Sequence, residues 1–121
     1  MELRISARHF ELEPEVKEYA EEKIMQLKKF FPDRKNKEEK FIDASLVLTL
    51  EKHRHRAELY LSIPGKKMFT KSETKDIYAS IDEVSHKMER MIRDYLDKLN
   101  HHKKSVSKEM KRKEFVGEEE I

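Results

Sequence analysis

The sequence contains no cysteine, which excludes disulfide bonds and thiolate chemistry and fits the reducing interior of a cell. It also lacks the unbroken apolar run that a secretory signal needs near the start of a chain. No stretch approaches the roughly 20 apolar residues required to span a bilayer. We therefore expect a soluble, cytoplasmic protein that is not inserted into a membrane.

Motifs of catalysis and cofactor binding are also missing from the sequence. It has no glycine-rich phosphate loop, no Gly-x-Ser-x-Gly elbow and no paired carboxylates beyond those that helix surfaces explain. His53 with His55, or His101 with His102, could bind a metal, but no carboxylate or cysteine pattern completes a familiar ligand set. We predict a protein that is not an enzyme and that has no metal, no cofactor and no small-molecule substrate.

Charge in this chain is dense but almost balanced. Charged residues make up 43% of the 121 residues, and 27 Lys and Arg oppose 25 Asp and Glu, which leaves a net charge of +2. The 36% of hydrophobic residues is enough for one core in a domain of this size. Because no segment is strongly basic, a nucleic-acid site would have to arise from basic side chains gathered on one face.

The first part of the chain predicts a strand, a helix and a second strand. Residues 3–8 alternate apolar and polar side chains, which is typical of a half-buried strand. Residues 14–31 place apolar side chains at helical spacing and begin with a proline, which is well suited to a first helical turn. A charged connector without periodicity covers residues 32–40, and the alternation of a strand returns in residues 42–50.

The second part predicts two more strands and a long helix. Residues 57–63 alternate again, so residues 51–56 should connect the two strands as a hairpin, and a weaker strand follows at residues 68–72. Thr74 is a candidate N-cap. Apolar residues then recur at three- and four-residue steps over residues 77–99, which is the strongest helical pattern in the chain.

This order of elements predicts an α+β fold with the arrangement β-α-β-β-β-α. Each helix has one apolar stripe, so both helices should pack on the same face of a four-stranded mixed sheet. The first two strands are joined through a helix and should run parallel, whereas the other strands form an antiparallel meander. We expect one domain over residues 1–104 and a flexible charged tail over residues 105–121, where basic and acidic blocks alternate.

Basic side chains on the two helices are the first candidates for a binding surface. On a helical wheel, Lys87, Arg90 and Arg93 lie away from the apolar stripe of the second helix. Lys23 falls within the stripe of the first helix, so it must either snorkel to solvent or lie in a water-accessible groove. In such a groove, Lys23 and Lys29 would face Lys87 and Arg90 and form a cationic trough for phosphates. An ordinary solvated helix surface explains the same residues, and both interpretations stay open.

The hairpin and the sheet offer two further groups of candidates. Residues 52–56, Lys-His-Arg-His-Arg, place five potentially cationic side chains in succession, and several of them must reach solvent. Tyr60 and Phe69 are expected on the sheet face opposite the helices. There they would either stack on RNA bases or simply pack against each other across the strands.

Three segments of the sequence resemble bacterial ribosome hibernation-promoting factors, a family also called ribosome-associated inhibitors or sigma-54 modulation proteins. They are MELRISARHFELEPEVKEYAEEKIMQLKKFF at the start, EKHRHRAE in the hairpin and DIYASIDEVSHKMERMIRDYLDKLNHHK in the long helix. The most specific part is DIYASID at residues 76–82, followed by Lys87 and Arg90. The resemblance implies a fold related to double-stranded-RNA-binding domains. It also implies binding to the 16S rRNA of the small ribosomal subunit, where messenger and transfer RNA would lie, so that occupancy blocks translation under stress.

The resemblance also assigns RNA contacts to individual basic residues, which are Lys23, Lys29, Lys52, Arg54, Lys87 and Arg90. Where the family often has a further lysine one turn after Arg90, this chain has Asp94, so Arg93 or Lys98 must substitute or that contact is lost. Long-form members carry a C-terminal dimerisation domain, and we expect this chain to be a short form that does not pair ribosomes directly. The alternatives are a general double-stranded-RNA-binding protein and a transcription-modulating module that binds other proteins.

Overall fold

The computed structural model describes residues 1–31 and 42–111, with side chains described through His101. Seven elements follow one another, and the order β-α-β-β-β-α expected from the sequence is confirmed. Their bounds are β1 Glu2–Arg8, α1 Pro14–Met25, the 3-10 helix η1 Gln26–Phe30, β2 Asp43–Glu51, β3 Arg54–Ile63, β4 Lys66–Thr74 and α2 Ile77–Lys111. The charged connector at residues 32–40 lies outside the described residues.

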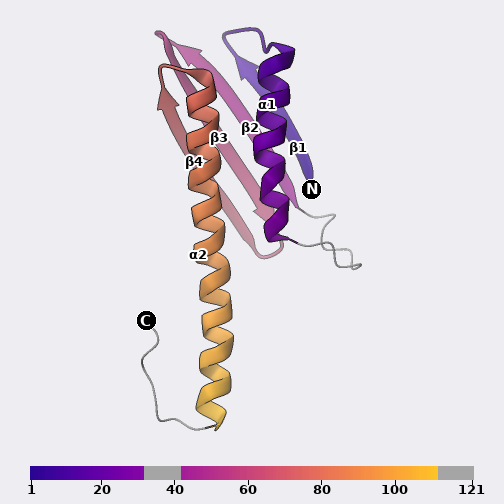
Figure 1. Ribbon diagram of the computed structural model, residues 1–121, viewed down its shortest axis with the longest axis vertical. Helices are drawn as coiled ribbons and strands as arrows, with labels where there is room; N and C mark the ends of the chain where they lie inside the picture. Colours follow the sequence, from indigo (N-terminus) through magenta and orange to yellow (C-terminus); the bar gives the residue numbers. More distant parts are fainter. Residues whose placement is uncertain (32–41, 112–121) are drawn as a thin grey trace. The chain divides into compact units, whose positions relative to one another are not determined.

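The four strands form one mixed sheet in the order β1-β2-β3-β4. β1 runs parallel to β2, whereas β2, β3 and β4 form an antiparallel meander, as the sequence predicted. The parallel pairing follows from the helical connection between β1 and β2, because only a long crossover can return the chain in the same direction. Figure 1 shows α1 and the first part of α2 in front of the same face of this sheet. The predicted fold class is therefore confirmed.

The hydrophobic core lies between the sheet and the helices. Strand side chains alternate between the two faces, and the register places Ile5, Leu46 and Leu59 in one row across the helix-facing side. Within Met1–Arg90 the buried hydrophobic residues are Val16, Ala20, Ile24, Leu27, Ile42, Ala44, Leu46, Leu48, Ala57, Leu59, Leu61, Ile63, Met68, Ile81, Val84 and Met88. They come from β2, β3 and β4, from α1 and η1, and from the start of α2, whereas the inward residues of β1 are only half-buried.

The first helix ends earlier than its apolar pattern predicts. α1 stops at Met25, and the next five residues form the 3-10 helix η1 instead of a further α-helical turn. Leu27 is still 1% exposed, because a tighter turn also returns every third residue to the same side. The pattern therefore identified the buried residue correctly, but it could not distinguish the two kinds of helix.

The second helix is longer than its apolar pattern predicts. The chain consists of two compact units, Met1–Arg90 and Met91–Ile121. α2 begins in the first unit and continues to Lys111 in the second. Leu99, which ends the predicted stripe, is 41% exposed and is not a core residue. The domain boundary after residue 104 stays a prediction, and residues 112–121 lie outside the described part. No helix among the described residues is long and apolar enough to cross a membrane.

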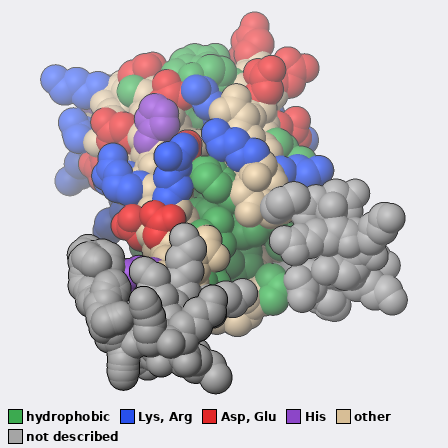
Figure 2. All heavy atoms as spheres, turned by 60° about the horizontal axis from the view of Figure 1, so that its bottom comes forward, with side chains coloured by type: hydrophobic (Ala, Val, Ile, Leu, Met, Phe, Trp, Pro, Cys, Tyr) green, Lys and Arg blue, Asp and Glu red, His purple; other side chains and the backbone are tan. Residues whose placement is uncertain are grey.

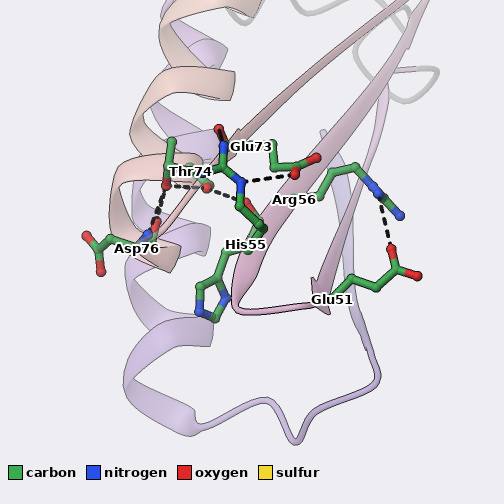
Figure 3. A network of polar contacts seen from close by, with 8 residues as sticks. Glu51, His55, Arg56, Glu73, Thr74 and Asp76 are labelled. Atoms are coloured by element: carbon green, nitrogen blue, oxygen red, sulfur yellow. Dashed lines mark hydrogen bonds and ion pairs between the residues drawn. The ribbon is translucent and has the colours of Figure 1, made fainter.

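α2 begins with a cap at Asp76 and not, as the sequence suggested, at Thr74. Asp76 Oδ2 accepts a 3.1 Å hydrogen bond from the backbone N–H of Ala79, the third residue of the helix. Thr74 Oγ1 instead accepts the Asp76 N–H at 3.0 Å and is hydrogen-bonded to Ser80 Oγ at 2.8 Å. Ser80 Oγ donates to the carbonyl of His55 at 2.6 Å, so this network, drawn in Figure 3, joins the helix start to β3.

Candidate nucleic-acid interface

Lys23 of α1 is neither deeply buried nor unpaired. Its side chain is 30% exposed, and its Nζ lies 3.6 Å from Asp82 Oδ1 on α2. The hydroxyl of Tyr19 donates a 2.6 Å hydrogen bond to the same oxygen, and the Tyr19 ring lies edge-on to Tyr78 with 4.9 Å between centroids. We call Tyr19, Lys23, Tyr78 and Asp82 the Asp82 cluster. In it the Lys23 ammonium avoids the cost of unpaired burial by meeting a carboxylate of the neighbouring helix.

The shared carboxylate also changes the acidity of the tyrosine. The hydrogen bond to Asp82, followed by desolvation, raises the pKa of Tyr19 to about 12. Hydrogen bonding and nearby negative charge both favour the neutral phenol, because a phenolate beside the Asp82 carboxylate would be repelled. Tyr19 is therefore a hydrogen-bond donor throughout the physiological pH range, and Asp82 is held in place from two sides.

Lys29 repeats this arrangement on η1. Its Nζ lies 3.8 Å from Glu89 Oε2 on α2 and 5.3 Å from the centre of the Phe30 ring. Asp82 and Glu89 are two helical turns apart, so both acids lie on the side of α2 that meets the first helix. Exposed pairs of this kind contribute about 0–1 kcal/mol each. The two ion pairs therefore orient the lysines but are weak enough for a phosphate to replace the carboxylate.

Lys87 lies on another side of α2 and makes a contact with the sheet. Its Nζ donates a 2.8 Å hydrogen bond to the backbone carbonyl of Lys71 on β4. β4 is an edge strand, and such strands leave backbone groups without a strand partner. The lysine thus covers part of this edge while its side chain stays exposed. Arg90 follows one turn later, is also exposed, and therefore lies on the same side of the helix.

The hairpin between β2 and β3 has a turn of only two residues, Lys52 and His53. Both have left-handed backbones, with φ of 50° and 65°, as in the type I′ turns that suit twisted hairpins. The predicted connection at residues 51–56 is therefore a hairpin, but a shorter one. Beside the turn, Arg54 Nε lies 3.1 Å from Glu73 Oε2, and its Nη2 donates to the Glu73 carbonyl at 3.2 Å (Figure 3). Lys52 itself is exposed at the tip.

Basic and acidic side chains are interspersed over the face of the molecule that Figure 2 shows, where blue and red alternate. Of the predicted site residues, Lys23, Lys29 and Arg54 each have a carboxylate within 4 Å. Among the described residues no ion pair includes Lys52, Lys87 or Arg90. The candidate interface therefore consists of two kinds of cation, those oriented by an acid and those outside any ion pair, of which Lys87 is hydrogen-bonded to the Lys71 carbonyl. Lys23 and Lys29 face Asp82 and Glu89, not Lys87 and Arg90 as the predicted trough required.

Sequence reasoning did not identify the acids that meet the two lysines. The signal was present, because Asp82 and Glu89 are seven residues apart and so share one side of an amphipathic helix. Arg93, the remaining predicted site residue, is exposed in the unit Met91–Ile121, as is Asp94. Among the described residues, no group of three or more histidines and carboxylates is placed to hold a metal ion.

Comparison with known proteins identifies the family. Residues 3–100 match the family described as Sigma 54 modulation protein / S30EA ribosomal protein. The chain belongs to this family. Membership in the S30EA family confirms the resemblance that the DIYASID segment and the Lys87 and Arg90 pair suggested.

The matches to individual relatives span most or all of each relative's length. The chain is 30% identical over 102 residues to a ribosome hibernation promoting factor of Klebsiella oxytoca, covering 84% of this chain and 100% of the relative. It is 26% identical over 98 residues to the factor of the same name from Pseudomonas putida, covering 81% and 89%. The N-terminal domain of Thermus thermophilus Protein Y has a similar fold, with a TM-score of 0.68 and 24% identity, covering 78% of this chain and 99% of that one.

Proposed function

We propose that this S30EA-family protein binds the small ribosomal subunit and inhibits translation by occupying the channel for messenger and transfer RNA. Its partner there is the 16S rRNA, which it contacts through basic side chains without catalysing a reaction. The match over residues 3–100 supports this proposal, as do relatives that are named ribosome hibernation promoting factors. The observation that carries it is the set of exposed cations Lys52, Lys87 and Arg90, together with the two lysines oriented by acids.

The two kinds of cation have different parts in this proposal. Lys52, Lys87 and Arg90 meet phosphates directly, and each contact releases counterions. The logarithm of the binding constant should therefore fall with the logarithm of the salt concentration, with a slope of about −0.7 to −0.9 per phosphate contact. The Lys29 side chain is 56% exposed, so its pair with Glu89 is weak and a phosphate can compete for it. Because most contacts are to phosphate, shape and register on the rRNA decide where the protein binds.

Sedimentation of the full chain with purified small subunits tests this function. The unaltered protein should co-sediment at low salt and be released at high salt. Lys87→Glu with Arg90→Glu should abolish co-sedimentation, because two exposed cations become anions beside phosphate. The matched control is Arg8→Glu with Lys17→Glu, which makes the same charge change at exposed positions outside the site and should leave binding intact. Equal binding of both double variants would refute the assigned site.

Displacement of transfer RNA tests the channel itself. Transfer RNA bound to programmed small subunits should be released as this protein is added, at a ratio near one protein per subunit. Binding without release would show that the protein sits elsewhere on the subunit. Plain duplex RNA serves as the competitor in a second arm. If duplex RNA competes as well as small subunits do, the protein is a general double-stranded-RNA binder instead.

A further inference from the structure

Two aromatic side chains lie exposed on the sheet face opposite the helices. Tyr60 on β3 and Phe69 on β4 are direct cross-strand partners, with ring centroids 4.7 Å apart and 39° between the ring planes. They are 47% and 43% exposed, whereas the residues on the inner side of the same strands are buried. No element within Met1–Arg90 covers them, and Figure 1 shows α1 and the first part of α2 on the other side of the sheet. Rings of this size are usually buried when they serve only packing.

The rings stand beside a shallow hollow in the sheet surface. Across the strands, Tyr60 pairs with Ser45, and Ser45 pairs with Arg4. The hollow has a volume of about 300 Å³ and is lined by these residues together with Ser62 and Lys67. The Lys67 ammonium, two serine hydroxyls and the Arg4 guanidinium, which is paired with Asp43 of the same hollow, thus surround two exposed rings. This is the combination of donors and aromatic surface that nucleotides require.

The charge around the platform favours an anionic strand. Lys67 and Lys71 lie two residues before and after Phe69, so both point to the same face as the ring. Among the described residues, no ion pair includes the ammonium of either lysine. Two acids of this face are already paired, Asp43 with Arg4 at 4.0 Å and Glu58 with Arg56 at 4.0 Å. The positive charge beside Phe69 is therefore available to a ligand.

We propose that this outer sheet face binds a segment of single-stranded RNA, with bases stacked on Tyr60 and Phe69 and phosphates beside Lys67 and Lys71. The site is distinct from the cations of the helix side and does not depend on the ribosome as target. A second copy of the chain fits this face less well. Packing two such sheets together would bury charged groups such as Glu58 and Lys71, at a desolvation cost that two aromatic rings per copy do not offset.

Titration with hexa-adenylate and hexa-uridylate RNA, followed by amide NMR shifts of the full chain, tests the proposal. Shifts should map to β3 and β4, and hexa-adenylate should bind more tightly because purines stack better. Tyr60→Leu with Phe69→Leu keeps an apolar cross-strand pair but removes both aromatic faces. It should weaken binding by about tenfold or more, as base–aromatic stacking predicts. Tyr78→Leu, which removes an exposed aromatic of the helix side, is the control and should bind normally.

Charge variants separate this site from the helix-side surface. Lys67→Ser with Lys71→Ser should weaken oligonucleotide binding and reduce its salt dependence. Lys17→Glu with Arg90→Glu changes helix-side charge while keeping the hydrogen bond from Lys87 to the Lys71 carbonyl, and it should leave oligonucleotide binding unchanged. The failure of one site can then be told from the failure of the other. If Tyr60→Leu with Phe69→Leu melts normally and binds the oligonucleotide with unaltered affinity, the proposal is overturned. NMR shifts confined to α1 and α2 would also refute the proposal.

Self-association of the free protein is the remaining outcome. If the free protein associates as its concentration rises, and the two leucine substitutions abolish this association, the face binds a second copy and the RNA proposal is wrong.

Discussion

The hydrogen bond between Tyr19 and Asp82 should be a measurable tie between the two helices. At 2.6 Å it joins a hydroxyl to a carboxylate, and such charge-assisted bonds contribute about 1.5–3 kcal/mol. The Asp82 side chain is 38% exposed, so we take the lower end, about 1.5 kcal/mol. The ion pair with Lys23 adds about 0.5 kcal/mol. Asp82→Ala should therefore lower the free energy of unfolding by about 2 kcal/mol, and Tyr19→Phe by about 1.5 kcal/mol.

A double-mutant cycle measured by urea unfolding isolates the interaction. Because both variants remove the same bond, Tyr19→Phe combined with Asp82→Ala should show a coupling free energy of about 1.5 kcal/mol. The melting temperature of Asp82→Ala should fall by roughly 8 °C in a chain of this length. Tyr78→Phe removes a hydroxyl from the same cluster without removing this bond and should leave stability unchanged. A coupling below about 0.5 kcal/mol would refute the view that the bond ties the helices together.

Three further predictions follow from the same structure. The pKa of Tyr19 is about 12 in the folded chain and about 10 when unfolded, so its stabilising bond is complete below pH 10 and is lost as pH rises through 12. Ultraviolet titration should detect one late tyrosine, and Asp82→Asn should bring its pKa back toward 10. Lys52→Asn with His53→Gly should stabilise the left-handed turn by about 1 kcal/mol in urea unfolding, whereas an unchanged midpoint would contradict the turn assignment. Leu59→Ala should cost about 2–5 kcal/mol by the same measurement, because the residue is fully buried, and a loss below 1 kcal/mol would contradict its place in the core.

The order of the elements and the sheet topology could be predicted from the sequence because they depend on local periodicity. Alternation located the strands, and the apolar stripes located both helices. The ends were less predictable, because competing local bonds decide them. Thr74 and Asp76 can both cap a helix, and only the structure shows that Thr74 is committed to Ser80 and that Asp76 receives the helix N–H. Similarly, the spacing of Leu27 fits an α-helix and a 3-10 helix equally well.

The candidate site was less predictable than the fold because its electrostatics depend on partners from distant parts of the chain. The sequence identified Lys23 as unusual, but its partner Asp82 lies on α2, and Tyr19 and Asp82 are 63 residues apart in the sequence. Glu89 likewise meets Lys29 across the helices, and no pattern within its own helix indicates this partner. Which residues contact RNA is a prediction that neither periodicity nor packing can test, and it requires the binding experiments above.

The parallel pairing of β1 with β2 has a consequence for how the chain folds. β2, β3 and β4 are joined by tight turns, so this meander can form from contacts that are close in sequence. β1 is made first during synthesis, but Leu3 and Ile5 must wait for Ala44 and Leu46 before they gain a strand partner. Pairing β1 with β2 closes the segment between Arg8 and Asp43, and the entropic cost of closing it is larger than for the short turns of the meander. We therefore expect β1 to join the sheet late in folding and to leave it early in unfolding, although it is synthesised before the three strands of the meander.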